Sequence, residues 1–320
     1  MSTMGAVVVD AAGGTDVLRS TRVPTPTRVS AEFLIRIAAA GVNPIDAKTR
    51  GGRGAAAGIE RYPVILGQDF SGTVVESPYE AHPIKPGDEV YGMTMAPRMQ
   101  GTYAELVAVP ALFVARKPKA LSRIEAAGVP LAALTAWGAV VDVAKAHEGQ
   151  RVLITAGAGG VGHFAVQFAS FFGARVVATG SQRNMSWLRE LGAHEVVDYT
   201  AGDWAAAVDP VDIVIDLLGN AKDDSGSRSL TRLKPGGLLV NVPTGSFPTM
   251  QDEAAALGVR ATGYRVSPDA TTLAVITRLI DSGDVRVHID RVFDLSEAPA
   301  AHEALEAGHT RGKIVLRVSG

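Results

Sequence analysis

The sequence predicts an α/β protein that combines a doubly wound parallel sheet with a smaller unit of short strands. Its 320 residues are enough for about two domains at about 150 residues each. Short apolar runs separated by Gly and Pro turns fill the first hundred residues, which is typical of a small barrel or sandwich. After residue 150 buried strand patterns alternate with helical ones, which indicates a parallel sheet covered on both faces.

The composition excludes several classes of protein. The chain has no cysteine, so disulfides and thiolate metal sites are impossible, and its net charge is only −2. A near-neutral chain without a long basic block has no electrostatic footprint for nucleic acid or an anionic membrane surface. The N-terminus lacks a signal-peptide pattern, and the uncharged stretch 152–174 is interrupted by glycines and changes from strand to helix. We therefore expect a cytoplasmic protein with neither membrane span nor nucleic-acid partner.

The first part reads as strands in a regular order. Phe33, Ile35 and Ile37 alternate with Leu34 and Arg36, which turns one face of that strand toward a core. Strands are expected at residues 7–9, 33–37, 64–66, 72–75, 89–92 and 103–109, with a turn at 85–88. A helix capped by Ser122, with Glu125 three positions on, and an apolar helix at 131–137 then lead into the second part.

The second part alternates strands and helices. Strands are expected at 151–155, 175–178, 195–197, 212–216 and 238–242, and helices through Gln167 and Phe171, at 184–191 and near 227–233. The C-terminal segment then predicts a helix at 268–282, strands at 285–289 and 313–318, and a helix at 298–307.

A glycine-rich turn joins the strand at 151–155 to the helix that follows it. Its residues Gly157, Ala158, Gly159, Gly160 and Val161, with Gly162 next, have the Gly-x-Gly-x-x-Gly spacing. In this context the first Gly permits the turn, the second lets a pyrophosphate approach the backbone, and the third lets the helix pack on the strand. The alternative is a glycine-rich turn that binds no ligand.

The end of the next strand indicates which dinucleotide binds. An NAD site usually has Asp or Glu about 20 residues beyond the glycines, and the sequence has no acid there. Ser181 can donate to a ribose 2′-phosphate and Arg183 can neutralise it. The cofactor expected is NADPH; the alternative is that Arg183 is a solvated residue at the start of a helix.

Eight segments together resemble the medium-chain dehydrogenase/reductase superfamily, in its zinc-independent, quinone oxidoreductase-like (zeta-crystallin-like) branch. They are residues 40–46, 63–72, 86–92, 101–105, 134–137, 157–162, 234–237 and 312–316, and they occur in the family's order along nearly the whole chain. The resemblance implies a Rossmann NADPH-binding domain at 123–266. It also implies a GroES-like β-barrel domain for catalysis and substrate, at 1–122 and 267–320.

No metal is expected. Gln68 and Asp69 stand where the zinc alcohol dehydrogenases of this superfamily carry His and Glu, and the chain lacks their cysteines. His302 and His309 have no partner at the spacing of a zinc site.

The resemblance also implies the residues of the active site. Asn43 and Thr135 are expected to line the nicotinamide pocket, while Tyr199, Leu218 and Val242 border the cofactor at strand ends. The catalytic candidates are Asn43, Asp46 and Lys48, the last two as a proton relay or a charge stabiliser. The alternatives are a helix cap for Asp46 and a solvated side chain for Lys48. Tyr62, Tyr91 and Tyr103 are further candidate donors.

The expected reaction is reduction of an activated double bond, in a quinone or an α,β-unsaturated carbonyl compound, by direct hydride transfer. One hydrogen-bond donor to the resulting enolate is worth roughly 3–4 kcal/mol, enough without a metal. One alternative is an enoyl-thioester reductase, with Arg50, Arg53 and Arg61 as a basic rim. Another is a non-catalytic NADPH-binding sensor or structural protein. The family also implies a homodimer through an edge strand near residues 261–266 and a small-molecule substrate.

Overall fold

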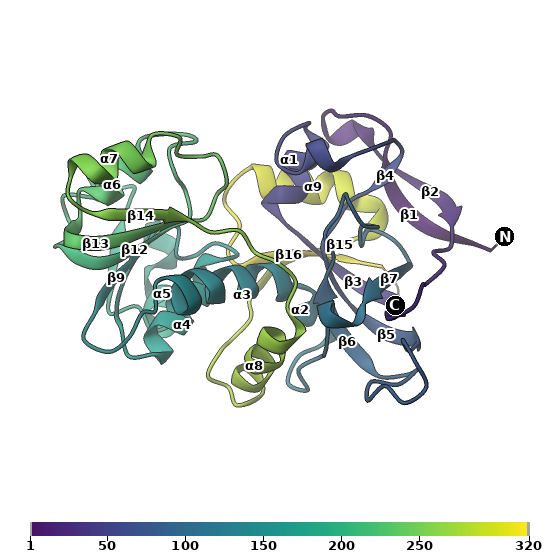
Figure 1. The fold of residues 1–320 in the computed structure, drawn as a ribbon. Coiled ribbons are helices and arrows are strands. Elements are labelled where there is room, and N and C mark those ends of the chain that lie inside the picture. Colours follow the sequence, from purple (N-terminus) through teal and green to yellow (C-terminus); the bar gives the residue numbers. More distant parts are fainter. Residues whose placement is uncertain (1, 319–320) are drawn as a thin grey trace. The chain divides into compact units, whose positions relative to one another are not determined.

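The computed structural model describes residues 2–318, whose strands form three sheets (Figure 1). By its contacts the chain divides into a first unit, residues 1–134, 267–283 and 287–320, and a second unit, residues 135–266 and 284–286. The domain limits that the sequence places after residues 122 and 266 stay a prediction.

The first unit contains two sheets. The smaller has the order β2-β1-β4, and the larger has the order β15-β16-β3-β5-β6-β8, with β7 also paired to β3. The strands are β1 Thr3–Val9, β2 Leu18–Pro24, β3 Glu32–Val42, β4 Val64–Ile65, β5 Asp69–Glu76, β6 Glu89–Met93, β7 Leu106–Pro110, β8 Val114–Arg116, β15 Ile289–Asp294 and β16 Lys313–Arg317. Within residues 2–318, the α-helices that lie wholly in this unit are α1 Pro44–Arg50, α2 Arg123–Ala127, α8 Ala270–Asp281 and α9 Ala298–Glu306.

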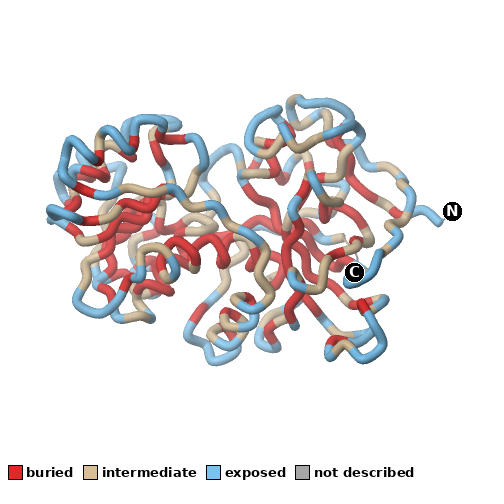
Figure 2. Tube along the Cα trace, in the orientation of Figure 1, coloured by how far each residue is buried: buried red, intermediate tan, exposed pale blue. Residues whose placement is uncertain are grey.

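The core of the larger sheet follows the alternation that the sequence predicts. Phe33, Ile35 and Ile37 of β3 are fully buried and pack with Phe70 of β5 and Val90 of β6. Figure 2 shows the buried strands of this unit in red. The cap predicted for α2 is also confirmed, because Ser122 and Glu125 form a reciprocal capping box.

The second unit holds one parallel sheet in the order β11-β10-β9-β12-β13-β14. The first strand in sequence lies centrally and the order runs outward on both sides, as in a doubly wound dinucleotide-binding fold. Its strands are β9 Arg151–Ile154, β10 Arg175–Gly180, β11 Glu195–Asp198, β12 Val211–Asp216, β13 Leu233–Asn241 and β14 Arg260–Gly263. The helices are α4 Gly162–Phe171, α5 Met185–Glu190, α6 Ser225–Leu230 and α7 Met250–Ala256; α3 Pro130–Trp137 crosses the boundary between the units.

Two predicted strands are displaced because their backbone groups have other partners. The strand expected at 285–289 begins only at Ile289. The side-chain amide of Gln167 donates to the carbonyl of Arg286 at 3.0 Å and accepts from its backbone N–H at 2.7 Å. Because both of its backbone groups are bonded in this way, Arg286 does not pair with a strand. The strand expected from residue 103 begins at Leu106: residues 106–110 pair with β3, whereas Ala104 forms an isolated bridge with Ala6 of β1.

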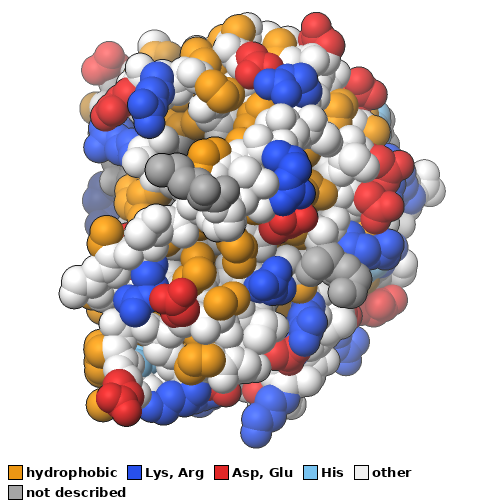
Figure 3. Space-filling view, turned by 90° about the vertical axis from the view of Figure 1, so that its right-hand side faces the viewer, with side chains coloured by type: hydrophobic (Ala, Val, Ile, Leu, Met, Phe, Trp, Pro, Cys, Tyr) orange, Lys and Arg blue, Asp and Glu red, His pale blue; other side chains and the backbone are white. Residues whose placement is uncertain are grey.

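Helix length and surface charge bear on the kind of environment that the protein contacts. None of the helices within residues 2–318 is both long and apolar enough to cross a membrane. On the face drawn in Figure 3, basic and acidic side chains are interspersed rather than gathered by sign.

Candidate functional site

Asn43 lies where β3 ends and α1 begins, and it is the centre of a buried polar cluster in the first unit. Its backbone is extended, and Pro44 follows at a position where proline suits a helix start. Oδ2 of Asp46 accepts a hydrogen bond from the Asn43 backbone N–H at 2.9 Å. Both residues are buried. The structure thus brings two catalytic candidates together and gives Asp46 its alternative role as a helix cap; the catalytic role stays a prediction.

Two side chains from distant parts of the sequence hold the amide of Asn43. Its Nδ2 donates to Oδ2 of Asp69 at 2.9 Å, and Nζ of Lys313 donates to its Oδ1. Lys313 also donates to the carbonyl of Val42 at 3.3 Å and lies 3.5 Å from Oδ2 of Asp69. Burial raises the pKa of Asp69 and lowers the pKa of Lys313, and the attraction between the two charges opposes both shifts.

A second chain of contacts leads from Asp46 to α9. Oδ2 of Asp46 lies 3.4 Å from the Tyr103 hydroxyl, which lies 3.1 Å from Nε2 of His302. Nδ1 of His302 lies 3.1 Å from Nη1 of Arg50, and Arg50 is ion-paired with Glu306 at 2.9 Å. Asp46, Tyr103, His302 and Arg50 are all buried.

The chemistry of these groups fixes the direction of every hydrogen bond in the chain. A guanidinium only donates, so Nδ1 of His302 accepts and Nε2 carries the proton. Burial, followed by the charge of Arg50, lowers the pKa of His302 to about 3, so the ring is neutral at pH 7. Nε2 therefore donates to Tyr103, which donates to Asp46. Because Arg50 does not release a proton, this series of hydrogen bonds orients Asp46 and delivers no proton to it.

Asp46 also has a strongly shifted pKa. Burial raises the pKa of its carboxyl to about 7, against the lowering effect of the hydrogen bond from Asn43. Oδ2 already accepts two hydrogen bonds, so a proton taken up near neutral pH resides on Oδ1.

The other charged candidates of this region lie apart from the cluster. Lys48 is half-buried, and within residues 2–318 its ammonium has no hydrogen-bond or ion-pair partner. The prediction of Arg50 as a basic rim residue is wrong: its side chain is 5% exposed and is held by Gly13, His302 and Glu306. Arg53 and Arg61 are exposed.

The candidate tyrosine donors differ in what they contact. Tyr103 belongs to the buried chain. The hydroxyl of Tyr91 donates to the carbonyl of Leu273 in α8 at 2.9 Å, and Tyr62 is 39% exposed. Only Tyr103 of the three, within the described part of the chain, contacts the Asn43 cluster through its hydroxyl.

In the second unit the glycine turn connects β9 to α4. A Cβ on Gly162 would lie 2.2 Å from the carbonyl oxygen of Ala156, so protein packing itself requires glycine there. A Cβ on Gly159 would meet only that same oxygen, at 3.3 Å. Its missing side chain leaves outward space, which suits a ligand approaching the backbone. The N-cap of α4 is Val161, which has no polar side chain to occupy the first N–H groups.

The predicted cofactor residues of this unit follow the ends of neighbouring parallel strands. Ser181 follows β10, Tyr199 follows β11, Leu218 lies two residues beyond β12, and Val242 follows β13. They share the carboxyl edge of the sheet with the glycine turn, where ligands bind in such sheets. Tyr199 and Leu218 are 49% and 42% exposed, so these two large side chains lie open at that edge. Thr135 is buried in α3, and Arg183 is exposed in the turn before α5.

Sequence reasoning missed four buried residues. It assigned no role to Lys313 or Asp69, treated His302 as uninformative, and did not mention Asp216 as a site residue. The available signal was a lone charge beside an apolar run, as in Lys313 before Ile-Val-Leu and Asp216 after Val-Ile.

Comparison with known proteins places the chain in a family. The family model described as "Alcohol dehydrogenase GroES-like domain" matches residues 30–119, and that described as "Zinc-binding dehydrogenase" matches residues 191–316. NAD(P)H oxidoreductase RTN4IP1, mitochondrial, from Danio rerio is 34% identical, over 98% of this chain and 91% of that protein. NADPH-dependent alkenal/one oxidoreductase, chloroplastic, from Arabidopsis thaliana is 32% identical, over 98% and 79%. The solved structure of the quinone oxidoreductase from Coxiella burnetii has 39% identity and a TM-score of 0.94, and the match covers 99% of this chain and 100% of that one.

The chain combines a parallel sheet and its glycine turn with a GroES-like domain, and this combination defines a nicotinamide-dependent oxidoreductase. The chain belongs to the medium-chain dehydrogenase/reductase superfamily, in the zinc-independent quinone oxidoreductase-like branch. Among residues 2–318, no three His, Cys, Asp or Glu side chains gather where they could hold a metal ion.

Proposed function

We propose that this chain is an NADPH-dependent reductase of quinones or of the activated C=C bonds of α,β-unsaturated carbonyl compounds. The observation that carries the proposal is the carboxyl edge of the second unit. There an open glycine turn lies beside a strand end, at Ser181 and Arg183, that offers a hydroxyl and a cation and no acid. Two of the similar proteins are named for alkenal/one and quinone reduction, which supports this substrate class.

The residues present fit the cofactor. The space outside Gly159 and the uncapped start of α4 suit a pyrophosphate, and Ser181 with Arg183 suits a 2′-phosphate. When bound, the nicotinamide supplies a hydride. Its addition to the β-carbon of an enone, or to a quinone, leaves negative charge on the substrate oxygen. Hydrogen-bond donors of this chain stabilise that charge, and protonation completes the reduction. Asn43 is the candidate donor and Asp46 the candidate proton-bearing group.

The cofactor proposal is tested by titrating the protein with NADPH and NADH, followed by fluorescence. In Arg183→Glu the affinity for NADPH should fall about tenfold or more, because one charge-assisted hydrogen bond is worth about 1.5–3 kcal/mol. NADH affinity should change little. Arg189→Glu, an equal charge change at another exposed arginine of the same segment, is the matched control. Equal losses for both nucleotides in Arg183→Glu would contradict the assignment.

The substrate class is tested by NADPH oxidation with a panel of quinones, enones and enoyl thioesters. Turnover of quinones or enones supports the proposal, and tight NADPH binding with no turnover of any class favours a non-catalytic binding protein. Arg53→Glu separates the thioester alternative. A thioester carrier bound through a basic rim would make this variant lose activity on enoyl thioesters and keep it on small enones.

The proposal extends to assembly and compartment. β14 is an edge strand of the parallel sheet and pairs only with β13 among the described strands, which suits a homodimer formed through it. Gel filtration at the mass of one 33.3 kDa chain would contradict the dimer. The proposed compartment is the cytoplasm, although two similar proteins are named mitochondrial and chloroplastic; fractionation of cells that express the protein tests this.

A further inference from the structure

We propose that Lys313 and Asp69 are positioning residues that hold the Asn43 amide in one orientation and leave it one N–H to donate to an oxygen of the bound cofactor or substrate. This inference rests on the proposed function. It concerns three residues of the first unit, contributed by β16, by the start of β5 and by the end of β3.

The orientation of the amide follows from its two partners. An ammonium only donates, so the Asn43 atom that contacts Lys313 must be the oxygen. A carboxylate only accepts, so the atom 2.9 Å from Asp69 must be the nitrogen. The flipped amide would place NH₂ against the ammonium and oxygen against the carboxylate. Two unfavourable contacts would therefore replace two favourable ones.

Asn43, Asp69 and Lys313 have little hydrogen-bonding capacity left after these contacts. Lys313 has three N–H donors and three oxygens around it, those of Asn43, Val42 and Asp69. Oδ1 of Asp69 accepts from the backbone of Leu131 at 2.7 Å, and Oδ2 faces both Asn43 and Lys313. The backbone N–H of Asn43 is held by Asp46. What these contacts leave unassigned is the second hydrogen on Nδ2 of Asn43.

Stability alone does not explain this arrangement. Lys313 and Asp69 are 3% and 0% exposed, and a buried ion pair is often no more stable than apolar residues of similar volume. The next residues of β16, Ile314, Val315 and Leu316, are fully buried and apolar. A charged residue at this one position therefore has a specific use, which is to select one orientation of a neighbouring amide.

The test is a double-mutant cycle between Lys313→Met and Asn43→Ala, measured by kcat/KM with the enone or quinone that wild type reduces and by the Kd for NADPH. Lys313→Met should lower one of these quantities by about tenfold, a fraction of the about 10²–10³ lost with a whole oxyanion donor. In the Asn43→Ala background the same change should have no further effect, because Lys313 acts through Asn43. Multiplying losses would show a merely structural role and overturn the proposal.

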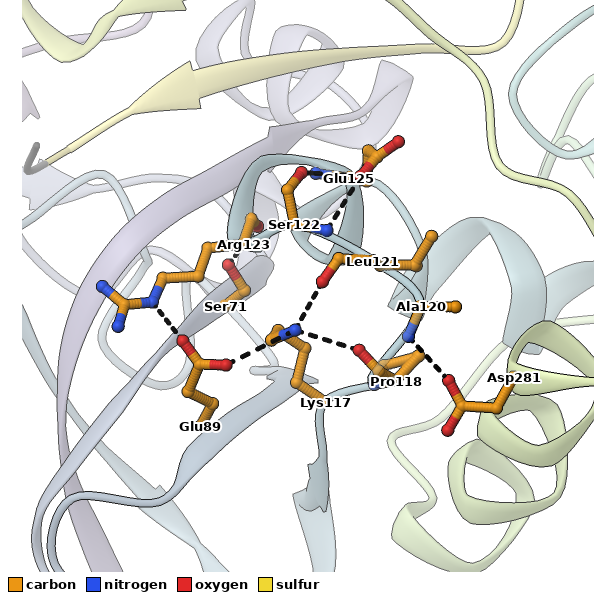
Figure 4. A network of polar contacts seen from close by, with 10 residues as sticks. All are labelled: Ser71, Glu89, Lys117, Pro118, Ala120, Leu121, Ser122, Arg123, Glu125 and Asp281. Carbon is orange, nitrogen blue, oxygen red and sulfur yellow. Dashed lines mark hydrogen bonds and ion pairs between the residues drawn. The ribbon is translucent and has the colours of Figure 1, made fainter.

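Lys117→Met is the matched control (Figure 4). The Lys117 side chain is 7% exposed and donates to the carbonyl oxygens of Pro118, at 2.9 Å, and Leu121, at 2.5 Å, while pairing with Glu89. It has no contact with Asn43 among the interactions of the described residues. Lys117→Met should lower stability and leave kcat/KM and the NADPH Kd within about twofold of wild type. A twofold change corresponds to a free energy smaller than RT, which is about 0.6 kcal/mol.

The two readouts separate the possible ligands. A weaker NADPH Kd assigns the acceptor oxygen to the cofactor, and a lower kcat/KM with unchanged Kd assigns it to the substrate. If Lys313→Met does not fold, Asp69→Asn takes its place in the cycle, because it removes one of the two partners that fix the orientation of Asn43 and keeps the buried volume unchanged. If wild type binds NADPH but reduces no quinone or enone, the proposed function fails and the cycle is read in Kd alone. Unchanged values in all variants would overturn the inference.

Discussion

Asp69 in the first unit and Asp216 in the second are both completely buried, yet their charges are stabilised in different ways. Asp69 faces the ammonium of Lys313, from β16. Among the interactions of the described residues, Asp216 accepts from neutral donors alone: the backbone N–H groups of Leu218 and Gly219 at 3.0 Å and 2.9 Å, Nδ2 of Asn241 at 2.7 Å, and Oγ1 of Thr155 at 3.4 Å.

The two arrangements have different consequences. Neutral dipoles around Asp216 shape a backbone turn at the carboxyl edge of the sheet, and they come mostly from its own and adjacent strands. The counter-charge of Asp69 fixes the orientation of a side chain, Asn43. The hydrogen-bond donors around Asp216, which lie nearby in the sheet, therefore shape a backbone turn. The ion pair of Asp69 with Lys313, which are far apart in the sequence, orients one functional side chain.

The largest expected effect comes from removing the counter-charge. Lys313→Met should lower the free energy of unfolding by about 3–5 kcal/mol, because an unpaired carboxylate stays buried. Lys313→Met/Asp69→Leu removes both charges and should recover at least half of that loss. Urea unfolding measures both variants. A double variant less stable than the single one would show that the two charges are not coupled as described.

A smaller effect is expected at Asp216. Asp216→Asn should cost about 1–3 kcal/mol in urea unfolding, because its NH₂ group would face donors and leave one of them unsatisfied. The affinity for NADPH should fall as well, since the turn with Leu218 is reshaped. The control is Asp212→Asn on the same strand, where the carboxylate is partly exposed and pairs with exposed Lys234; it should cost less than about 1 kcal/mol. Equal losses at the two positions would remove the distinction.

The smallest net effect is expected in the pH dependence of wild-type stability, because two buried groups contribute to it with opposite signs. His302 has a folded pKa of about 3, below its ordinary 6.5, so its contribution is complete above pH 6.5 and is lost as pH falls toward 3. Asp46 has a folded pKa of about 7, above its ordinary 3.8, so its contribution falls as pH rises from about 4 to 7. Between pH 4 and 6.5 the stability contribution of His302 rises with pH while that of Asp46 falls, so the two changes oppose each other.

Variants separate these slopes in a series of Tm measurements from pH 4 to 7.5. His302→Gln should lose less stability on acidification than wild type, and Asp46→Asn should lose more. The same direction of change in both variants would show that one of the two pKa shifts has the wrong sign.

Local patterns in the sequence were sufficient to predict most of the fold. The alternation of Phe33, Ile35 and Ile37, the cap at Ser122 and the glycine turn each depend on neighbours within a few residues, and the structure contains all three. The strand expected at 285–289 is displaced because its partner is a side chain, Gln167, more than a hundred residues away. Periodicity carries no information about such a contact.

The site was predictable only in part for the same reason. Asn43 and Asp46 lie within one helical turn, so the sequence could place them together. Lys313, His302 and Asp69 reach them through strand pairing and helix packing across most of the chain. Arg50 was expected at a basic rim with Arg53 and Arg61, and its burial is an exception to the usual exposure of arginine. Glu306 and His302, both on α9, hold that arginine inside.

The long sequence separation of Lys313 from Asp46 and Asp69 also affects synthesis. As the protein leaves the ribosome, both buried acids, Asp46 and Asp69, are made long before the lysine that faces Asp69. The N-terminal part of the barrel cannot close over these carboxylates at low cost until β16 pairs with β3, as Ile314 does with Val42. The pairing of β16 with β3 is therefore the step that completes the charge balance of the barrel, and a nascent chain that has not yet reached Lys313 leaves Asp69 without its counter-charge.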